Sequence, residues 1–357
     1  MNNIKKLMII GGGTGGHILP GIEIAKYLKN KGWKIYWIGT TRKMEYLLIP
    51  KEKIKFKSIE ISGLRGKGIK NFFCNFIKIF EAILKSKKII NKYQPDIILS
   101  MGGYISGPGS IAGWISNIPI ILHEQNTIAG LTNRFLSLFA KLVLQAFPNT
   151  FKDAQTVGNP ISKKILNIEV PQKRFKHRNK IIRILILGGS QGSQTINRII
   201  PKIASELDKK ILILHQTGKG LKKETKKIYD QLNNKLKNYK LIEFIKNISQ
   251  AYNWADVVIS RSGALTVTEI ATIGLPAIFI PFEHKDQQQY KNALILKKIG
   301  SAIIIKEKNL TPQKIIKILK SWNREDLLKM AKRSKNIAIR NSTEKISSIL
   351  IDIVKNK

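Results

Sequence analysis

Two glycine-rich segments of the chain have the residue types that could hold a phosphate group. They are MIIGGGTGGH, residues 8–17, and LILGGSQGS, residues 185–193. In each segment a short apolar run turns through glycines to a Ser or Thr, and a helical pattern follows. A strand that ends this way brings backbone N–H groups and a helix N-terminus to one point, which favours an anion. The alternative is a tight strand–helix turn that needs glycine only for its backbone geometry.

A second polar cluster spans residues 260–292. Ser260 and Arg261 directly follow an apolar run, and residues 263–269 then open a helix. The first N–H groups of a helix have no acceptor inside it and carry the positive end of the helix dipole. The donors that would face a bound diphosphate in this way belong to Ala264, Leu265 and Thr266.

Three side chains of the same cluster have the chemistry to bind a sugar. Glu269 lies about one helical turn further in, where a carboxylate can bind a ribose diol. Its alternative role is that of an ordinary acid that complements the helix dipole. Gln288 and Gln289 follow another apolar run and offer the uncharged donors and acceptors that sugar hydroxyls require.

His17 is the leading candidate for a general base that activates a hydroxyl group. It follows the first glycine loop, and an imidazole titrates near working pH. The alternative is a structural histidine that packs the loop. His123 and Glu124, at the end of a predicted strand, are the next candidates.

The first glycine loop does not fit the two commonest nucleotide motifs. Gly11, Gly13 and Gly16 match G-x-G-x-x-G, but the dinucleotide motif also needs an acidic residue after the second strand. The chain reads GTTR there, residues 39–42. Neither glycine loop continues into Gly-Lys-Ser/Thr, which excludes a P-loop. No Asp-x-Asp occurs either, so we expect no metal at the diphosphate and no required cofactor.

The elements that must position these residues alternate along both halves of the chain. A helix is predicted over residues 17–30 by its apolar spacing. Strands are predicted at residues 7–10, 34–38, 96–100, 119–123, 142–146, 183–187, 211–215, 240–244, 257–260, 277–281 and 302–305. Apolar strands separated by helices indicate parallel sheets covered on both faces. Ligands of such sheets bind beyond the carboxyl ends of the strands.

The expected architecture is therefore α/β, with two Rossmann-like parallel-sheet domains facing a cleft. We place the first domain at residues 1–161, a linker at 162–180 and the second domain at 181–340. Residues 341–357 have helical spacing, with Asn341 and Glu344 placed as in a capping box. This last helix is expected to pack back on one of the domains, and we assign it to the first.

The composition limits the class of protein. The chain has 357 residues, 43% of them hydrophobic, a formal charge of +40 and one cysteine, Cys74. This fits a globular protein in a reducing compartment. No run of 18 uncharged apolar residues occurs, so no spanning helix is predicted. The apolar run near the N-terminus is too short for a signal segment.

The positive charge has two interpretations. It is either compositional drift, with Lys scattered over nearly every surface stretch, or a sign of an anionic partner such as lipid or nucleic acid. No segment has the pattern of a nucleic-acid-binding module. We therefore expect no nucleic acid as a partner.

Residues 69–88 favour the lipid interpretation. Apolar residues at helical spacing are Phe73, Phe76, Ile77, Phe80 and Leu84. Basic residues around them are Arg65, Lys67, Lys70, Lys78, Lys85, Lys87 and Lys88. An apolar stripe with basic flanks is typical of a helix that lies on an anionic membrane. The alternative is a helix that packs its stripe on the sheet.

Seven strings, taken in order, resemble one family along nearly the whole chain. They are GGTGGHILPG, ISGLRGKGIK, MGGYISGPG, LHEQNTIAGLTN, VGNP, LGGSQGS and RSGALTVTEIATIGLPAIFIPFEHKDQQQYKNA. The chain is thus identified as a member of the MurG family of peripheral membrane glycosyltransferases. These add N-acetylglucosamine to the undecaprenyl-pyrophosphoryl-muramyl-pentapeptide precursor of peptidoglycan.

The resemblance implies a fold, a reaction and a location. The fold is GT-B, with the nucleotide sugar held mainly by the C-terminal domain. The reaction is an inverting transfer from UDP-N-acetylglucosamine to the C4 hydroxyl of the muramyl acceptor, which converts lipid I to lipid II. The location is the cytoplasmic face of the plasma membrane, where the protein is peripheral.

The resemblance also implies the residues that bind substrate. In chain order they are Thr14, Gly15, Gly16, Asn126, Ser190, Ile245, Ala264, Leu265, Thr266, Val267, Thr268, Glu269, Gln288 and Gln289. Ser190 and the backbone of the helix start hold the diphosphate, the backbone of Ile245 contacts uracil, and Glu269 binds ribose. The two glutamines and Asn126 hold the N-acetylglucosamine. The three loop residues before His17 line the acceptor side and contribute to binding of the nucleotide sugar.

One residue departs from the family pattern. The family commonly has Arg two residues after the proline of GNP, where this chain has Ser162. Lys163 or Lys164 could replace it as a point charge, but without the bidentate fork of Arg.

Two rival functions remain open at this stage. One is a GT-B transferase that uses another UDP-sugar or another lipid acceptor, such as diacylglycerol. The other is a non-catalytic binder of nucleotides or nucleic acid, which only the charge supports.

Overall fold

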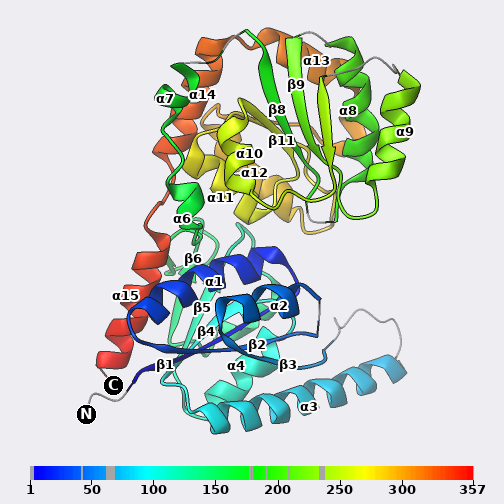
Figure 1. The fold of residues 1–357 in the computed structure, drawn as a ribbon. Helices are drawn as coiled ribbons and strands as arrows, with labels where there is room; N and C mark the ends of the chain where they lie inside the picture. Colours follow the sequence, from blue (N-terminus) through cyan, green and yellow to red (C-terminus); the bar gives the residue numbers. More distant parts are fainter. Residues whose placement is uncertain are drawn as a thin grey trace. The chain divides into compact units, whose positions relative to one another are not determined.

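The structure is a computed structural model that describes residues 4–41, 43–61, 69–176, 178, 180–189, 191–207, 210–232 and 238–356. Its contacts divide the chain into two compact units (Figure 1). The first comprises Met1–Ser162 and Ile339–Lys357, and the second Lys163–Ala338.

The first unit is built on a seven-stranded sheet in the order β3-β2-β1-β4-β5-β6-β7. Its strands are β1 (Lys6–Gly11), β2 (Lys34–Gly39), β3 (Lys55–Ser58), β4 (Ile97–Gly102), β5 (Ile120–Glu124), β6 (Leu142–Gln145) and β7 (Gln155–Thr156). Its helices are α1 (Gly15–Asn30), α2 (Lys43–Leu48), α3 (Ile69–Tyr93), α4 (Ser106–Ile115), α5 (Leu131–Leu136) and α15 (Ser342–Lys355). Neighbouring strands in the described residues pair in parallel. The central strands β4 and β5 are buried along their whole length, and each begins with an apolar run, Ile97–Leu99 and Ile120–Leu122, as expected for strands covered on both faces.

The second unit has a six-stranded parallel sheet in the order β10-β9-β8-β11-β12-β13. Its strands are β8 (Ile182–Leu187), β9 (Ile211–Gln216), β10 (Tyr239–Ile242), β11 (Val257–Ser260), β12 (Ala277–Phe279) and β13 (Ala302–Ile304). Its helices are α6 (Lys163–Leu166), α7 (Pro171–Lys176), α8 (Gln194–Glu206), α9 (Lys222–Leu232), α10 (Ile248–Trp254), α11 (Ala264–Ile273), α12 (Gln288–Lys298), α13 (Pro312–Ser321) and α14 (Arg324–Asn336).

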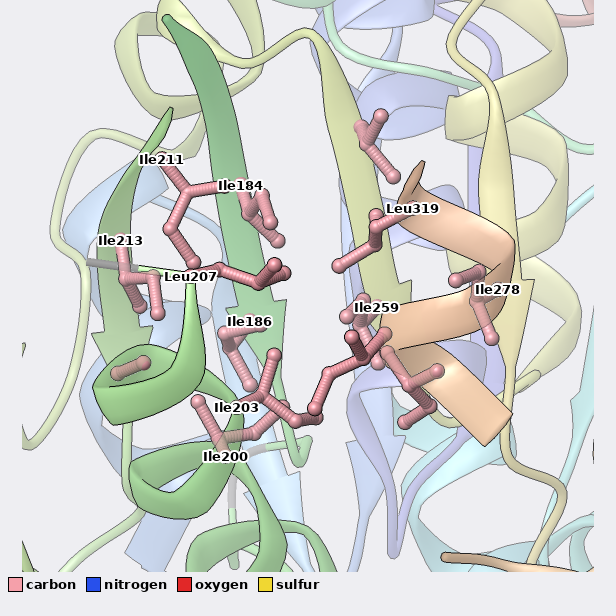
Figure 2. Packing of buried hydrophobic residues seen from close by; sticks show 14 of the residues in the cluster. Ile184, Ile186, Ile200, Ile203, Leu207, Ile211, Ile213, Ile259, Ile278 and Leu319 are labelled. Carbon is pink, nitrogen blue, oxygen red and sulfur yellow. The ribbon is translucent and has the colours of Figure 1, made fainter. Parts of the chain in front are cut away.

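The core of the second unit lies between its sheet and the helices that cover it. Figure 2 shows isoleucines of β8 and β9 facing side chains of α8 and α13. Ile186 and Ile259 on neighbouring strands are fully buried there. Branched side chains of this kind fill the pleated face of a parallel sheet well, so the strands are held in a fixed register under the loops that follow them.

The expectation of two α/β domains with parallel sheets is confirmed. Each strand predicted from an apolar run is present, with ends that differ by up to two residues. The sequence prediction missed the two edge strands of the first sheet, β3, whose residues KFKS include one apolar side chain, and the two-residue β7.

The predicted capping box at the last helix is wrong. Asn341 does precede α15, but its side chain accepts no capping hydrogen bond. Its backbone angles, φ −103° and ψ 27°, differ from the extended geometry usual for a capping residue. The helix α15 itself packs against α1, as Figure 1 shows, and buries Ile346, Leu350 and Val354 in the core of the first unit.

Residues 162–180, where we expected a linker, contain the short helices α6 and α7. Within the second unit α6 packs against α11, and α7 packs against α14. Arg174 on α7 is buried and donates hydrogen bonds to the carbonyl oxygens of Ile273 (3.3 Å) and Gly274 (2.6 Å). These carbonyls end α11, so the guanidinium both satisfies the helix terminus and complements its dipole.

In the part of the chain that the structure describes, no helix combines the length and the apolar character needed to cross a bilayer.

Candidate active site

The first candidate site lies where the strand order of the first sheet reverses. β1 and β4 are neighbours, but their connections lead to opposite sides, and such a point leaves a crevice at the carboxyl ends. The glycine loop after β1 and the segment after β4 meet there. A Cβ on Gly103 would lie 2.3 Å from the carbonyl oxygen of Gly12, and Gly103 also has φ +86°. Both facts require glycine at this position.

His17 stands at this reversal point on the first turn of α1. Its Nδ1 lies 3.0 Å from the carbonyl oxygen of Gly12 and 3.3 Å from Oγ1 of Thr14. A carbonyl oxygen only accepts, so Nδ1 carries the proton and donates it to Gly12. Nε2 then keeps its lone pair and has no hydrogen-bond partner among the described residues. The ring lies against Gly102, where a Cβ would come within 3.2 Å of Nε2.

The electrostatic surroundings keep His17 neutral. Burial lowers the pKa of its imidazole below the usual 6.5. The hydrogen bond to Gly12 and the charges of Glu124 and Glu45 oppose this shift without cancelling it. A neutral imidazole with a lone pair on Nε2 is the form in which histidine accepts a proton.

Glu124, an alternative base, accepts hydrogen bonds that stabilise the segment after β5. It ends β5 and is buried. One carboxylate oxygen accepts hydrogen bonds from the backbone (2.9 Å) and side-chain amide (3.1 Å) of Asn126. The other accepts from the backbone of Gly130 (3.2 Å) and the amide of Asn133 (2.8 Å). Four hydrogen bonds occupy the lone pairs of this carboxylate, which leaves little room for a substrate hydroxyl to approach it.

His123, the other alternative, is fully buried with both ring nitrogens engaged. Nε2 donates to the carbonyl oxygen of Gly158 (3.0 Å), and Nδ1 accepts from the amide of Gln125 (3.0 Å). Burial lowers the pKa of His123 to about 4. The geometry therefore favours His17 over both neighbours as the base.

The other predicted residues of the first unit lie close to His17 along the chain or at the same sheet edge. Thr14 precedes α1 in an extended conformation, and Gly15 and Gly16 are its first residues. All three are at least partly exposed. Asn126 follows β5 and is held by Glu124 as described.

The second candidate site lies at the strand-order reversal of the second sheet, between β8 and β11. The second glycine loop follows β8. Ser190 in that loop lies outside the described residues. Gly192 in this loop meets Gly218, which follows β9 on the other side of β8, since a Cβ on Gly218 would lie 2.3 Å from the Cα of Gly192, and both have positive φ. Geometry alone therefore accounts for these two glycines.

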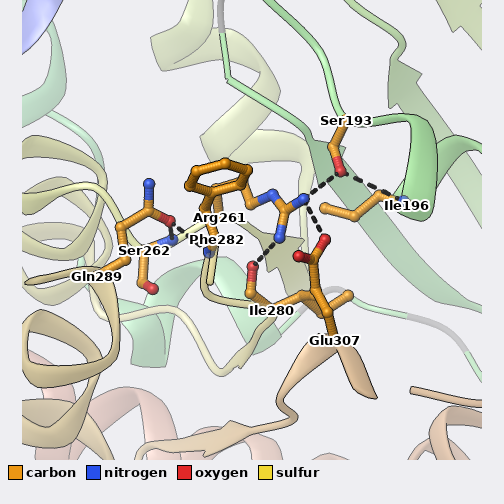
Figure 3. Close-up of polar contacts among 8 residues, drawn as sticks. All are labelled: Ser193, Ile196, Arg261, Ser262, Ile280, Phe282, Gln289 and Glu307. Carbon is orange, nitrogen blue, oxygen red and sulfur yellow. Dashed lines mark hydrogen bonds and ion pairs between the residues drawn. The ribbon is translucent and has the colours of Figure 1, made fainter. Parts of the chain in front are cut away.

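Arg261, directly after β11, ties this edge together (Figure 3). Its Nη2 donates to Oγ of Ser193 (2.8 Å) and forms an ion pair with Glu307, while Nη1 donates to the carbonyl oxygen of Ile280 (3.0 Å). Its guanidinium also stacks over the ring of Phe282, 5.5 Å from the centroid. Ser193 caps α8, so Arg261 fixes the end of the glycine loop to β12 and to the turn at Glu307–Asn309.

The helix α11 begins at Ala264, three residues after this arginine. Gly263 precedes it in an extended conformation and supplies no side-chain cap. The N–H groups of Ala264, Leu265 and Thr266 consequently lack an acceptor inside the helix. Val267 and Thr268, further along, have buried side chains. Their side chains face the protein interior, so their predicted role in substrate binding would fall to their backbone groups.

Glu269 lies on α11 and accepts a hydrogen bond from the hydroxyl of Tyr252 (2.8 Å). Burial raises the pKa of its carboxyl to about 7, and the bond from Tyr252 opposes this shift. Carboxylates with perturbed pKa values cluster at functional sites.

Ile245 is connected to the second glycine loop through Gln216. The Oε1 of Gln216 accepts from the N–H of Ile245 (3.0 Å), and its Nε2 donates to the carbonyl oxygen of Gly189 (3.1 Å). With its N–H engaged, the backbone group of Ile245 available to a base is its carbonyl.

The two predicted glutamines are the first residues of α12. Oε1 of Gln289 accepts from the N–H groups of Phe282 (3.0 Å) and Ser262 (3.3 Å), as Figure 3 shows. This leaves its amide NH₂ to donate to a sugar. The N–H of Gln288 donates to Asp286 (3.1 Å).

Sequence reasoning missed two residues that shape these sites, Glu45 and Gln216. It singled out Arg261 but missed that this side chain bridges three segments. Each acts on a loop far away in the sequence, and an isolated polar residue at a strand end gives no local signal of its partner. Among the described residues, no group of three or more His, Cys, Asp or Glu side chains could hold a metal ion.

The comparisons with known proteins assign the family. Residues 7–145 match the family model described as the glycosyltransferase family 28 N-terminal domain, and residues 183–349 match the C-terminal domain of the same family. The chain belongs to glycosyltransferase family 28, and within it to the MurG family expected from the sequence. It is thus an enzyme with the two α/β domains of the GT-B fold.

Similar proteins are found over the full length. A relative from Proteus mirabilis is 49% identical over 98% of both chains, and one from Buchnera aphidicola subsp. Schizaphis graminum is 52% identical over 98% of this chain and 99% of its own. Both are named UDP-N-acetylglucosamine–N-acetylmuramyl-(pentapeptide) pyrophosphoryl-undecaprenol N-acetylglucosamine transferase. The crystal structure of Acinetobacter baumannii MurG matches with a TM-score of 0.83 at 33% identity, covering 99% of this chain and 100% of that one.

Proposed function

We propose that this enzyme transfers N-acetylglucosamine from UDP-N-acetylglucosamine to the C4 hydroxyl of the undecaprenyl-pyrophosphoryl-muramyl-pentapeptide acceptor. The observation that carries the choice of substrates is the identity of 49–52% with relatives named for this transfer, over at least 98% of each chain. The chemistry is supported separately, by an unprotonated nitrogen on His17 in the first unit and a free helix N-terminus in the second.

The second unit supplies the donor site. The N–H groups at the start of α11 bind the diphosphate, together with Ser190, and Glu269 accepts hydrogen bonds from the ribose hydroxyls. The carbonyl of Ile245 receives the N–H of uracil, because its own N–H is held by Gln216. The NH₂ group of Gln289 binds the N-acetylglucosamine. Gln288 and, from the first unit, Asn126 complete this set.

The first unit supplies the base. His17 Nε2 takes the proton of the acceptor hydroxyl as its oxygen bonds to the anomeric carbon, and the bond from that carbon to the diphosphate oxygen breaks. UDP leaves with the bonding electron pair, and the configuration inverts. The helix dipole of α11 and its N–H donors stabilise the charge that develops on the leaving diphosphate.

Lys163 or Lys164 could add a positive charge to the donor site. Both are exposed at the start of α6, which packs against α11. The family commonly has an arginine where this chain has Ser162. An ammonium group on α6 would replace its charge, but as a point charge without bidentate geometry.

An exposed apolar surface on the first unit supports a peripheral place at the cytoplasmic face of the membrane. Ile77, Phe80 and Leu84 on α3 are 58%, 57% and 51% exposed. The opposite side of α3 is buried, at Ala82 and Ile90. Packing on the sheet, one of the two alternatives for this helix, thus accounts for one face of α3, and we propose the membrane as the partner of the exposed face. The residues 69–76 include Phe73 and Phe76, whose side chains are outside the description, as are Arg65 and Lys67.

The apolar surface continues beyond α3. The helix α4 packs against both α3 and α5. Trp114 on α4 is 57% exposed, Phe135 on α5 is 55% exposed, and Leu138, just after α5, is 80% exposed. Exposed apolar side chains on neighbouring helices are typical of an interfacial site. It would bring the enzyme to its lipid-linked acceptor.

The assay that tests the proposed function uses radiolabelled UDP-N-acetylglucosamine and a short-chain analogue of the lipid acceptor. We expect labelled disaccharide product with the muramyl acceptor and none with diacylglycerol. Efficient use of diacylglycerol, or of a different UDP-sugar in preference, would establish the rival transferase instead.

His17→Ala is expected to lower turnover by at least about 10²-fold, because the acceptor hydroxyl loses its general base. Affinity for UDP-N-acetylglucosamine should stay close to that of the unchanged protein, since the donor site lies in the other unit. Steady-state kinetics and calorimetry measure the two quantities. Near-normal turnover would remove His17 from this role.

Glu269→Ala is expected to weaken binding of UDP-N-acetylglucosamine by roughly tenfold or more, the effect of losing charge-assisted hydrogen bonds. The ribose hydroxyls are bound best by the ionised carboxylate, whose pKa of about 7 in the free protein means that acid removes it. Affinity should therefore fall as the pH drops below about 7, by up to about tenfold per pH unit. Calorimetry between pH 8 and pH 6 measures this. In Glu269→Gln the side chain is neutral throughout, and this pH dependence should vanish. A variant with unchanged affinity and pH profile would refute the ribose assignment.

Phe80→Glu is expected to reduce sedimentation of the protein with anionic liposomes, because it places a charge in the apolar surface of α3. Leu232→Glu, at a residue of α9 that is 40% exposed, makes the same change on the other unit and serves as the matched control. Equal binding by the two variants would contradict the proposed membrane surface.

A further inference from the structure

A buried carboxylate occupies the first glycine loop. Glu45 lies on α2, just after β2, and is 0% exposed. Its Oε1 accepts hydrogen bonds from the N–H of Gly13 (2.8 Å) and from the hydroxyl of Thr40 (2.6 Å). A Cβ on Gly12 would lie 2.5 Å from the same oxygen, so glycine at that position is what lets the carboxylate approach.

This contact changes the meaning of the first glycine loop. The sequence pattern predicts backbone donors that await a phosphate. The N–H of Gly13 already has an anionic partner within the protein. A second feature needs explanation as well, because Oε2 of Glu45 is buried with no partner among the described residues. A buried oxygen without a hydrogen bond lowers the stability of the fold, so its presence needs an explanation.

The peptide group between Gly12 and Gly13 links this carboxylate to His17. Its N–H donates to Glu45, and its carbonyl oxygen accepts from Nδ1 of His17 (3.0 Å). A peptide group that donates to an anion becomes a stronger acceptor at its carbonyl, because hydrogen bonds in a chain polarise one another. One hydrogen bond therefore runs from the imidazole of His17 to the peptide carbonyl, and a second runs from the peptide N–H to the carboxylate of Glu45.

We propose that Glu45 is a positioning residue for the transfer reaction, acting on His17 through the peptide group between Gly12 and Gly13. It holds the imidazole in the form with its proton on Nδ1 and stabilises the imidazolium that forms when Nε2 takes the acceptor proton. That proton passes to solvent after UDP has left. The inference rests on the proposed role of His17 as base.

The charges around His17 are consistent with this role. Glu45 from α2 and Glu124 at the end of β5 are the charged groups that act on it, and both raise the pKa of the imidazole against the effect of burial. Glu124 is held by four hydrogen bonds to other groups. Glu45 is the carboxylate that reaches the imidazole through a shared peptide.

Glu45→Gln tests the proposal, because the amide keeps the size of the side chain and an oxygen for Gly13 but loses the charge. We expect kcat to fall by about tenfold, with an unchanged KM for UDP-N-acetylglucosamine. Removing a negative charge lowers the pKa of His17, so the acid limb of the kcat profile should move to lower pH. Glu60→Gln makes the same charge change at an exposed residue of this unit and should leave kcat and the acid limb unchanged.

Nitrogen-15 NMR of the histidine ring gives a readout that does not depend on turnover. In the unchanged protein we expect His17 to carry its proton on Nδ1, and its protonation midpoint should fall in Glu45→Gln. A proton on Nε2 in the unchanged protein would overturn the proposal even if Glu45→Gln failed to fold.

The failure of this inference is distinguishable from that of the proposed function. If His17→Ala keeps normal turnover, His17 is not the base, and the proposed mechanism fails together with this inference. An inactive His17→Ala, together with Glu45→Gln that keeps normal kcat and a normal His17 titration, overturns only the role of Glu45.

Discussion

The candidate sites depend on one constraint, the contact of backbone with backbone between the loops that follow two neighbouring strands in each sheet. In the first unit the loop after β4 touches the loop after β1 at Gly103 and Gly12. In the second, Gly192 and Gly218 meet in the same manner. A side chain at these positions would push the loops apart, so glycine determines how closely the polar groups beyond the strands can approach one another. His17 and Arg261 each stand directly beside such a contact.

The sequence predicted the frame well because the frame is set by local pattern. Strands such as Ile97–Gly102 and Val257–Ser260 are buried on both faces, so their residues are mostly apolar and do not alternate with charged ones. The edge strand Lys55–Ser58 has no such pattern and was missed. In the candidate site, the position of His17 could be predicted from the loop before it. The hydrogen bonds that Glu124 accepts from Asn126 and Asn133 could not be predicted. They depend on how the loop after β5 folds back toward the carboxylate, which no local pattern in the sequence indicates.

The high net charge has little part in the interior of either site. The charged residues that organise the site loops are mainly acids: Glu45 and Glu124 in the first unit, Glu307 opposite Arg261 in the second. Lysines such as Lys163 and Lys164 lie on the exposed side of short helices. The charge of +40 therefore belongs chiefly to the surface. Charge at the surface acts at long range and is screened by salt.

The two glycine loops look alike in sequence but differ in what they hold. In the first, the N–H of Gly13 is bound by the buried Glu45 of the same unit, which makes the loop a rigid support for an imidazole. In the second, the residue that closes the loop is a cation, Arg261, and it binds the cap of the following helix through Ser193. An anion inside the first loop would repel a phosphate, whereas a cation beside the second attracts one. We propose that the same backbone motif serves proton transfer in the first unit and binding of the diphosphate in the second, with an acidic side chain nearest the first loop and a basic one nearest the second.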